Sequence, residues 1–497
     1  MITVMLDEPS FQYDVHSLIK AFYPQEDITF PATEDQTETS GFLIETGADG
    51  GRPENEPCRI VCRYVEDKKT VSERESCLNP SDSDEAAEER LRIKNELKRT
   101  LYRLLEEITG RSLPWGTLTG IRPVKIPMKM LQEGHDEREI RTCMQENYFT
   151  SDEKIRLATD IAKRERNILQ GLHTTDGFSL YIGIPFCPTT CMYCSFTSYP
   201  IGKYRELTDA YLAALDAELG LISETFAGKV LDSIYIGGGT PTTLESSQME
   251  TLRRMLETYF DLRTVREFTM EAGRPDSITV EKLATMRAIG IDRMSVNPQT
   301  MHDETLKVIG RRHSVQQTVE AFHMAREAGF TNINMDIILG LPGEDEAMLQ
   351  GTLDQIESLS PDALTVHSMA IKRAAAMQDF LKEHKELESK NTPEMMDLCG
   401  TYAERMGMHP YYLYRQKNMT GNFENVGYAA DGKYGLYNIL IMEEVQHIAA
   451  AGAGTISKIL FQDGRIERCD TIKDVDLYLR SLDSVIEKKR AFFSRLP

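Results

Sequence analysis

Six short apolar segments alternate with helical stretches in the middle of the chain, and this repeat limits the fold more than any other feature. The segments cover residues 179–184, 232–237, 267–271, 292–297, 332–338 and 363–368. Regular alternation of strand and helix is typical of a parallel sheet, and six such units predict an open partial (β/α)6 barrel. Ligands of such sheets bind at the carboxyl ends of the strands, so we expect the functional residues there.

The length of the chain predicts several domains. Its 497 residues exceed the roughly 250–300 residues at which one hydrophobic core usually stops growing. From the patterns we expect a small N-terminal α/β domain, a helical segment, the barrel, and a mainly helical C-terminal domain that covers the barrel mouth. These four parts are predicted at residues 1–85, 86–172, 173–375 and 376–497.

The N-terminal domain shows mixed strand and helix patterns. Strands are predicted at 2–6, 41–45 and 59–65, and a helix at 13–22. The polar run at 79–88 is typical of a linker that caps a long helix, because Ser and Asp precede regularly spaced leucines.

Composition limits the compartment and the partners. A formal net charge of −21, without a basic stripe carrying interleaved aromatics, argues against nucleic acid as a partner. No apolar run approaches the roughly 20 residues that span a bilayer, and the N-terminus lacks the pattern of a secretory signal. We therefore expect a cytoplasmic protein without a membrane span. Its nine cysteines are an odd and sparse set that favours reduced, metal-binding thiols over a disulfide scaffold.

Three of these cysteines follow the first barrel strand in a C-x3-C-x2-C arrangement, as Cys187, Cys191 and Cys194. Three thiolates can hold three irons of a four-iron cluster and leave the fourth iron open to a cofactor or substrate. A structural zinc site is the alternative, but it usually takes four ligands and no fourth Cys or His is near in sequence. A redox dithiol of Cys191 and Cys194 would leave Cys187 unexplained.

A glycine-rich motif, GGGTPT at 237–242, directly follows the second barrel strand. Glycines let backbone amides approach a ligand closely, and the absence of a following Gly-Lys-Ser/Thr excludes a Walker loop. After the cysteine loop, this motif resembles the GGxTP motif with which radical S-adenosylmethionine (SAM) enzymes bind the amino group of methionine.

Residues 179–375 resemble the radical SAM superfamily, and within it the oxygen-independent coproporphyrinogen III oxidase (dehydrogenase) family. The family's Y-x-H-I-P-F-C appears here as YIGIPFC, and its GGGTPT is intact. PWGTLTGIRP near the N-terminus and YYLYRQKN followed by GNFENVGYA near the C-terminus are similar to the HemZ-type branch of that family. The resemblance implies a 4Fe-4S cluster on the three cysteines, with SAM as a second cofactor.

The resemblance also implies the residues that contact SAM, with Tyr181 packed near the cluster-bound cofactor and Ala370 near its adenine. The implied contacts are Tyr181, Gly238, Gly239, Thr240, Glu271, Gln299, Arg311, Asp336 and Ala370. Without the resemblance, Glu271 and Asp336 are acids in otherwise apolar strands, which are costly to bury unless a ligand binds them. Gln299 and Arg311 would otherwise read as solvated surface residues.

The chain departs from the family at two positions. Cys194 is followed by Ser195 and Phe196, so the additional cysteine of the family's C-x3-C-x2-C-x-C loop is missing, and Gly183 replaces the family's histidine. Related heme-trafficking proteins also lack that cysteine but usually carry an H-N-x-x-Y-W motif in the C-terminal part. The only tryptophan here is Trp115, far upstream, which argues against a simple heme chaperone.

The resemblance implies a radical SAM oxidoreductase of porphyrin and heme biosynthesis that decarboxylates coproporphyrinogen III to protoporphyrinogen IX. It further implies a flavodoxin- or ferredoxin-like electron donor. The propionates of a tetrapyrrole need cationic partners, for which Arg312, Arg373 and Arg415 are candidates. Two alternatives remain open: a heme or tetrapyrrole carrier in which SAM is regulatory or vestigial, and a different radical SAM activity on heme.

Overall fold

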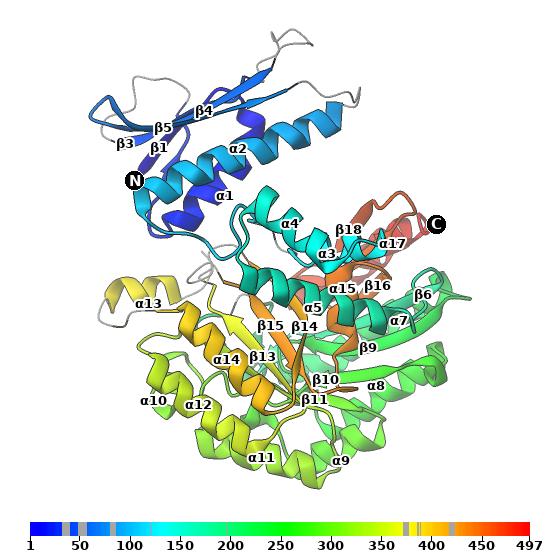
Figure 1. Ribbon diagram of the computed structural model, residues 1–497. Helices are drawn as coiled ribbons and strands as arrows, with labels where there is room; N and C mark the ends of the chain where they lie inside the picture. Colours follow the sequence, from blue (N-terminus) through cyan, green and yellow to red (C-terminus); the bar gives the residue numbers. More distant parts are fainter. Residues whose placement is uncertain are drawn as a thin grey trace. The chain divides into compact units, whose positions relative to one another are not determined.

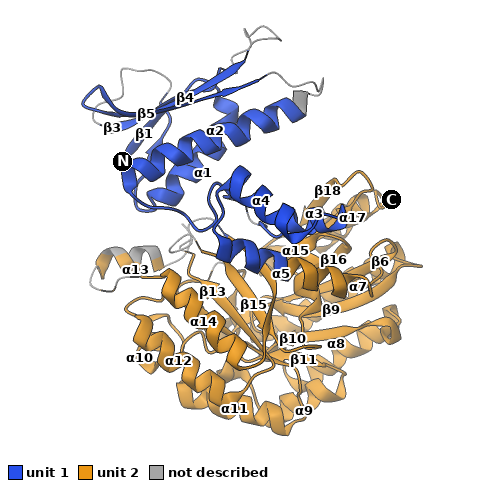
Figure 2. Cartoon of the chain, viewed as in Figure 1, with its two compact units in different colours: residues 1–160, 416–418 blue, residues 161–415, 419–497 orange. Residues whose placement is uncertain are grey.

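The computed structural model describes residues 1–31, 40–47, 57–79, 86–120, 122–194, 196–370, 377–384, 387, 389–416 and 423–497. The chain divides into two compact units (Figure 2), of which unit 1 comprises Met1–Asp160 with Gln416–Asn418 and unit 2 comprises Ile161–Arg415 with Met419–Pro497. The predicted division into four parts is finer than these two units and stays a prediction. None of the described helices is both long and apolar enough to cross a lipid bilayer.

Unit 1 begins with a five-stranded sheet in the order β2-β1-β3-β4-β5. Its strands are β1 (Ile2–Leu6), β2 (Ile28–Thr29), β3 (Ser40–Glu45), β4 (Cys58–Glu66) and β5 (Lys69–Leu78). Its helices are α1 (Gln12–Phe22), α2 (Ala86–Thr109), α3 (Lys125–Gln132), α4 (Glu137–Tyr148) and the first half of α5 (Asp152–Leu169). Strand β1 lies parallel to β2 and β3, whereas β3, β4 and β5 form an antiparallel meander.

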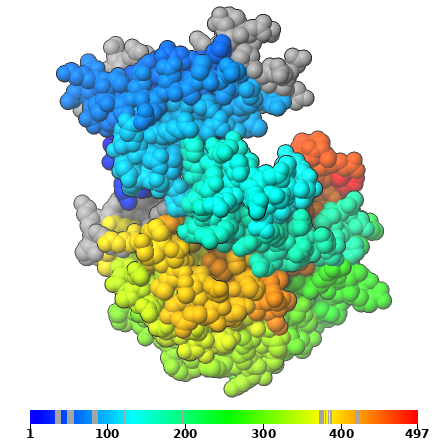
Figure 3. Space-filling view, viewed as in Figure 1, coloured from blue at the N-terminus to red at the C-terminus, as the bar shows by residue number. Residues whose placement is uncertain are grey.

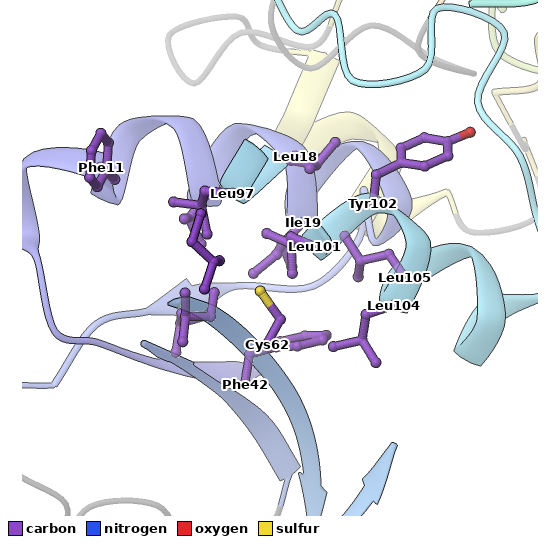
Figure 4. Packing of buried hydrophobic residues seen from close by; sticks show 14 of the residues in the cluster. Phe11, Leu18, Ile19, Phe42, Cys62, Leu97, Leu101, Tyr102, Leu104 and Leu105 are labelled. Carbon is purple, nitrogen blue, oxygen red and sulfur yellow. The ribbon is translucent and has the colours of Figure 1, made fainter. Parts of the chain in front are cut away.

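The core of unit 1 is an apolar layer between this sheet and helices α1 and α2 (Figure 4). Leu18 and Ile19 of α1 meet Leu101 and Leu105 of α2, at the helical spacing that puts apolar residues on one face. The sheet contributes Phe42, which is also fully buried. The segments predicted as strands at 2–6, 41–45 and 59–65 and as a helix at 13–22 all form such elements.

Unit 2 contains an 11-stranded sheet in the order β14-β15-β13-β12-β11-β10-β9-β6-β16-β17-β18. Its centre consists of the six predicted strands, each parallel to the next. These are β6 (Gly177–Ile184), β9 (Val230–Gly238), β10 (Glu267–Glu271), β11 (Arg293–Ser295), β12 (Ile333–Leu339) and β13 (Ala363–Ser368). The mixed α/β fold with an open, parallel (β/α)6 core is therefore confirmed.

Helices connect the parallel strands and lie along one side of the sheet (Figure 1). They are α6 (Ile201–Tyr204), α7 (Thr208–Thr225), α8 (Ser246–Tyr259), α9 (Val280–Ala288), α10 (Asp303–Val308), α11 (Val315–Glu327) and α12 (Glu346–Leu359). A two-stranded sheet of β7 (Phe186–Cys187) and β8 (Tyr199–Pro200) lies within the first of these connections.

The C-terminal region is helical, as expected, and it also extends the sheet at both edges. Its helices are α13 (Met377–Glu383), α14 (Pro393–Arg405), α15 (Leu436–Glu443), α16 (Val475–Arg480) and α17 (Leu482–Phe493). Its strands are β14 (His409–Tyr414), β15 (Asn425–Ala429), β16 (His447–Ala451), β17 (Ile456–Leu460) and β18 (Ile466–Asp470). Every residue of β15 and β16 is buried, so these strands lack the polar alternation by which a strand is usually recognised.

Helix α14 packs on α12 at the surface of unit 2, where its residues form part of the yellow and orange area (Figure 3). Arg405 of α14 pairs with Glu357 of α12 at 2.7 Å. Exposed ion pairs of this kind contribute at most about 1 kcal/mol, so the apolar contacts beneath them hold the helix in place.

Candidate active site at the carboxyl ends of the barrel strands

The cysteine loop begins where β6 ends and folds back on itself. Cys187 is buried, Cys191 and Cys194 are half-buried, and none of the three is in a disulfide. The backbone N–H of Cys194 donates to the carbonyl oxygen of Cys191 at 3.1 Å. One loop therefore presents all three thiols at the carboxyl end of the first barrel strand.

Side chains from outside the cysteine loop donate hydrogen bonds to these sulfurs. The hydroxyl of Thr240 donates to Cys187 Sγ at 3.4 Å, and Nη1 of Arg274 donates to Cys191 Sγ at 3.7 Å. Arg274 is only 3% exposed and also binds Thr189, through its carbonyl oxygen and its hydroxyl, each at 3.0 Å. Hydrogen bonds to ligand sulfurs stabilise thiolates and tune the redox potential of a cluster. Sequence reasoning missed Arg274, although it stands three residues after Glu271.

The donor set fits a cluster. Burial raises the pKa of Cys187 to about 11 and also raises that of Cys194. Coordination to a metal favours the ionised thiolate and would oppose this effect. No three His, Cys, Asp or Glu side chains of the described residues are grouped closely enough for a single metal ion. A four-iron cluster binds each thiolate to a different iron, so its ligands do not need to converge on one point.

The glycine-rich motif lies directly against the cysteine loop. The N–H of Gly239 donates to the carbonyl oxygen of Ile184 at 2.8 Å, and that of Thr240 to Phe186 at 2.7 Å. Gly238 has a left-handed backbone with φ of 105°. A Cβ on Gly239 would lie 2.6 Å from the carbonyl oxygen of Phe186, so only glycine permits this approach. The two motifs that sequence reasoning linked by order are thus in contact.

Glu271 occupies the last position of β10, on the same side as Tyr235 of β9. The hydroxyl of Tyr235 donates to Glu271 Oε1 at 2.5 Å. Burial raises the pKa of Glu271 to about 7, which outweighs the lowering effect of this hydrogen bond. The Tyr181 ring stacks on Tyr235 with ring centroids 6.0 Å apart. A cationic ligand group beside Glu271 would favour the ionised carboxylate.

Gln299 is held in a left-handed conformation with φ of 68°, which is uncommon for a residue with a side chain. Its N–H donates to the carbonyl oxygen of Asp336 at 2.9 Å, and its carbonyl oxygen accepts from Ile338 at 3.0 Å. Its side chain is buried, and Oε1 has no hydrogen-bond partner among the described residues. Gln299 is therefore not a solvated surface residue, and its amide is available to a ligand.

Arg311 is also buried, at 6% exposure. Its Nη1 donates to the carbonyl oxygen of Asn297 at 2.6 Å, and its Nη2 donates to the Tyr193 hydroxyl in the cysteine loop at 3.2 Å. Its Nε has no hydrogen-bond partner among the described residues. Arg311 is therefore not a solvated surface residue. Its contact with SAM stays a prediction.

Asp336 lies on β12, half-buried beside Asn334 and His367. Nδ2 of Asn334 donates to Asp336 Oδ1 at 2.7 Å, and Nε2 of His367 lies 3.7 Å from Oδ2. Burial alone raises the pKa of Asp336. The hydrogen bond and charge of His367, together with hydrogen bonds from Asn334 and Thr365, outweigh burial and hold this pKa below its ordinary value. Ala370 follows β13 and is half-buried.

At Gly183, where the family has a histidine, the structure leaves no space for a side chain. A Cβ at this position would lie 2.5 Å from Thr455 Cγ2, in the turn that joins β16 to β17. The hydroxyl of Tyr211 holds the carbonyl oxygen of Gly183 at 2.7 Å. The C-terminal turn therefore fills the space next to β6 that a side chain would need. Phe196 is 71% exposed, and Ser195 lies outside the described residues.

The arginines predicted to bind propionates have different environments. Arg312 is exposed, whereas Arg415 is only 4% exposed. Burial lowers the pKa of Arg415 to about 10, against an opposing effect of Glu424. Arg373 lies outside the described residues. Their role as propionate partners stays a prediction.

Comparisons with known proteins agree with this geometry. The family model described as the radical SAM superfamily matches residues 181–356. The chain is 40% identical over 409 residues to the oxygen-independent coproporphyrinogen-III oxidase-like protein HemZ of Bacillus subtilis, covering 81% of this chain and 82% of HemZ. It is 34% identical to the heme chaperone HemW of the same organism, covering 47% of this chain and 62% of HemW.

Two further matches concern an enzyme of Escherichia coli. Its oxygen-independent coproporphyrinogen III oxidase is 32% identical over 192 residues, which cover 39% of this chain and 42% of the oxidase. The solved structure of coproporphyrinogen III oxidase (HemN) from the same organism aligns with a TM-score of 0.50 and 21% identity. That alignment covers 64% of this chain and 72% of HemN, and it supports the fold alone.

Proposed function

Since this chain belongs to the radical SAM family of oxygen-independent coproporphyrinogen-III oxidase-like HemZ proteins, we propose that it cleaves SAM reductively and acts on a tetrapyrrole. The observation that carries the proposal is the contact between the two motifs. Three thiols lie on one loop, and the hydroxyl of Thr240 from the glycine-rich motif binds Cys187 Sγ at 3.4 Å. A cofactor held by the glycine-rich loop would therefore lie next to the cluster.

The chain's own residues have distinct proposed roles. Cys187, Cys191 and Cys194 would hold the cluster, and Arg274, which is also paired with Asp276 at 2.8 Å, would donate a hydrogen bond to the Cys191 thiolate. When bound, the cluster supplies one electron that breaks SAM into methionine and a 5′-deoxyadenosyl radical, which abstracts hydrogen. Glu271 would accept hydrogen bonds from the ammonium group of SAM. The electron would come from a flavodoxin- or ferredoxin-like donor in the cytoplasm.

The proposed substrate is coproporphyrinogen III. Removal of a hydrogen atom from the β-carbon of a propionate, loss of its carboxyl group as carbon dioxide and transfer of one electron to a one-electron acceptor leave a vinyl group. Two such rounds give protoporphyrinogen IX. The names of HemZ and of the Escherichia coli oxidase support this substrate. Any step that uses the family's additional cysteine has no counterpart here, because Phe196 takes its place.

A heme carrier is the second candidate, favoured by the similarity to HemW. Both candidates can be separated by incubating reconstituted protein anaerobically with SAM, a reductant and either coproporphyrinogen III or heme. We expect 5′-deoxyadenosine and two successive losses of carbon dioxide plus two hydrogens, detected by mass spectrometry. Stoichiometric heme binding without 5′-deoxyadenosine would instead support the carrier.

Two variants serve as controls for this experiment. Cys191→Ala should abolish 5′-deoxyadenosine formation, because the cluster loses a ligand. Phe196→Cys restores the family's additional thiol at an exposed position, and we expect SAM cleavage to continue in it. If only Phe196→Cys forms vinyl groups, the native chain is not a coproporphyrinogen dehydrogenase.

A further inference from the structure

Helix α15 carries an aromatic residue from the C-terminal region to the face of the barrel sheet that bears the predicted SAM contacts. The first residues of the helix are fixed by Glu267 of β10, a carboxylate only 5% exposed. Its two oxygens accept from the N–H groups of Leu436 at 2.7 Å and Tyr437 at 3.1 Å. A carboxylate at a helix N-terminus satisfies unpaired N–H groups and complements the helix dipole.

The residue before α15 allows this close approach. A Cβ on Gly435 would lie 2.8 Å from the hydroxyl oxygen of Tyr411 and 3.2 Å from Cζ of Arg293. Glycine is the only residue without a Cβ, so the chain can pass between these two side chains. The position of Tyr437 is therefore set by the sheet at two points, Glu267 and the space at Gly435.

Tyr437 completes a group of three stacked rings. Its ring centroid lies 4.7 Å from that of Tyr235 at an interplanar angle of 26°, and 5.8 Å from that of Tyr181 at 23°. The rings of Tyr181 and Tyr235 are 6.0 Å apart at 13°. Aromatic rings favour offset stacking at such centroid distances, so each pair stabilises the orientation of its two rings. Removing Tyr437 therefore leaves the other two rings without a shared partner.

Both partners of Tyr437 belong to the candidate site. Tyr235 donates to Glu271 Oε1 at 2.5 Å. A Cβ built on Gly238 would lie 3.5 Å from the hydroxyl oxygen of Tyr181, so that hydroxyl reaches the glycine-rich loop. Burial raises the pKa of Tyr437, and the neighbouring Tyr181 and Glu271 raise it further. A change at Tyr437 thus reaches two predicted contacts of SAM at once.

We propose that Tyr437 is a positioning residue of the SAM site, whose ring fixes the orientations of Tyr181 and of the hydrogen-bonded Tyr235 and Glu271. The inference rests on the proposed function. The inference goes beyond the proposed function, because Tyr437 lies outside residues 181–356, the segment that matches the radical SAM family. A segment that the family core does not include would therefore complete the cofactor site.

The test compares Tyr437→Leu, Tyr437→Phe and the native chain, each with its cluster reconstituted anaerobically in the full-length protein. SAM binding is measured by equilibrium dialysis and by the change that SAM causes in the electron paramagnetic resonance spectrum of the reduced cluster. We expect Tyr437→Leu to raise the Kd for SAM at least tenfold and Tyr437→Phe to change it less than threefold. Iron content and the spectrum without SAM should stay native.

Tyr434→Leu is the matched control, because the Tyr434 ring packs at a tilt of 48° against Tyr411, with centroids 5.4 Å apart, and has no recorded ring contact with Tyr181 or Tyr235 among the described residues. Its Kd should stay within twofold of native. A Kd within twofold of native in iron-loaded Tyr437→Leu overturns the inference. If Tyr437→Leu does not load iron, Tyr437→Met is tested in its place, because methionine has a flexible, unbranched side chain. The same twofold limit on the Kd for SAM then applies.

The outcomes for this inference and for the proposed function are distinguishable. Native protein that binds SAM without releasing 5′-deoxyadenosine contradicts the proposed function, while the Kd comparison for Tyr437 can still be made. Native protein that cleaves SAM, together with an unchanged Kd in Tyr437→Leu, contradicts only the inference. A lower melting temperature with an unchanged Kd would show that the ring serves packing alone, and would also contradict it.

Discussion

Unit 1 and unit 2 each contain a sheet backed by helices, but the two sheets differ in the residues that they carry. In unit 1 the covered face is apolar, and burial raises the pKa of its Cys62 thiol. In unit 2 one face of the sheet carries Tyr181, Tyr235, Glu271 and Asp336.

The difference is clearest along β11 and the residues after it. Ser295 Oγ, Asn297 Oδ1 and Gln299 Oε1 are buried on alternate residues, and none has a hydrogen-bond partner among the described residues. Each such atom costs about 1–3 kcal/mol unless something binds it. Three such atoms in succession are what a ligand-binding face would show, which supports the proposed function. The predictions below test this contrast between a face that packs and a face that binds.

The largest expected effect is at the cysteine loop. Cys191→Ala should remove the iron–sulfur absorbance and all SAM cleavage, because two thiolates cannot hold the cluster. Cys62→Ser in unit 1 is the matched change, and it should keep full iron content while destabilising the chain by about 1–3 kcal/mol. Iron analysis and thermal unfolding measure both. Iron loss in Cys62→Ser would contradict the assignment of the cluster to the loop.

The apolar core of unit 1 should respond in stability and not in binding. Leu101 is fully buried between α1 and the sheet, so Leu101→Ala should cost about 2–5 kcal/mol through lost burial and a cavity. Urea unfolding measures the loss, and equilibrium dialysis should show an unchanged Kd for SAM. A weakened Kd in the folded variant would mean that the two units are coupled.

At the edge of the barrel, Gly183→Ala should destabilise unit 2 by about 1–3 kcal/mol, because the new Cβ meets Thr455 Cγ2 at 2.5 Å. Thr455→Ser removes that methyl group and keeps the hydroxyl that donates to Gly452 at 2.7 Å. The double variant should therefore recover most of the lost melting temperature. No recovery would show that the clash is not with Thr455.

The last prediction concerns protonation of Glu271, whose pKa of about 7 lies above the ordinary value of 4.5. The folded chain holds this proton better than the unfolded one, so its contribution to stability is complete below pH 4.5 and is lost as pH rises through 7. The proposed contact with the ammonium group of SAM needs the ionised form, so the affinity for SAM should rise by up to about tenfold per pH unit below 7. Glu271→Gln should flatten both profiles, measured by melting and by dialysis. A native profile in Glu271→Gln would exclude Glu271 as the titrating group.

Sequence reasoning located the six parallel strands and the two motifs, because apolar runs and glycine or cysteine spacing are local signals. It did not locate β15 and β16, which are buried throughout and lack the alternation of a half-exposed strand. Arg274, Tyr235 and Tyr437 were missed for another reason. An isolated arginine or tyrosine has no pattern in sequence, and only its contacts distinguish it from a surface residue.

The sequence by itself determined the family, the open parallel barrel and the loop that presents three thiols, since short-range spacing specifies each of them. Only the tertiary structure decided what surrounds that loop. It brought Arg274 to Cys191, set Thr455 against Gly183 and stacked Tyr437 on Tyr181. These contacts join residues far apart in the chain, and they form because strand pairing at the sheet edges and burial of α15 fix segments that carry no local signal of their own.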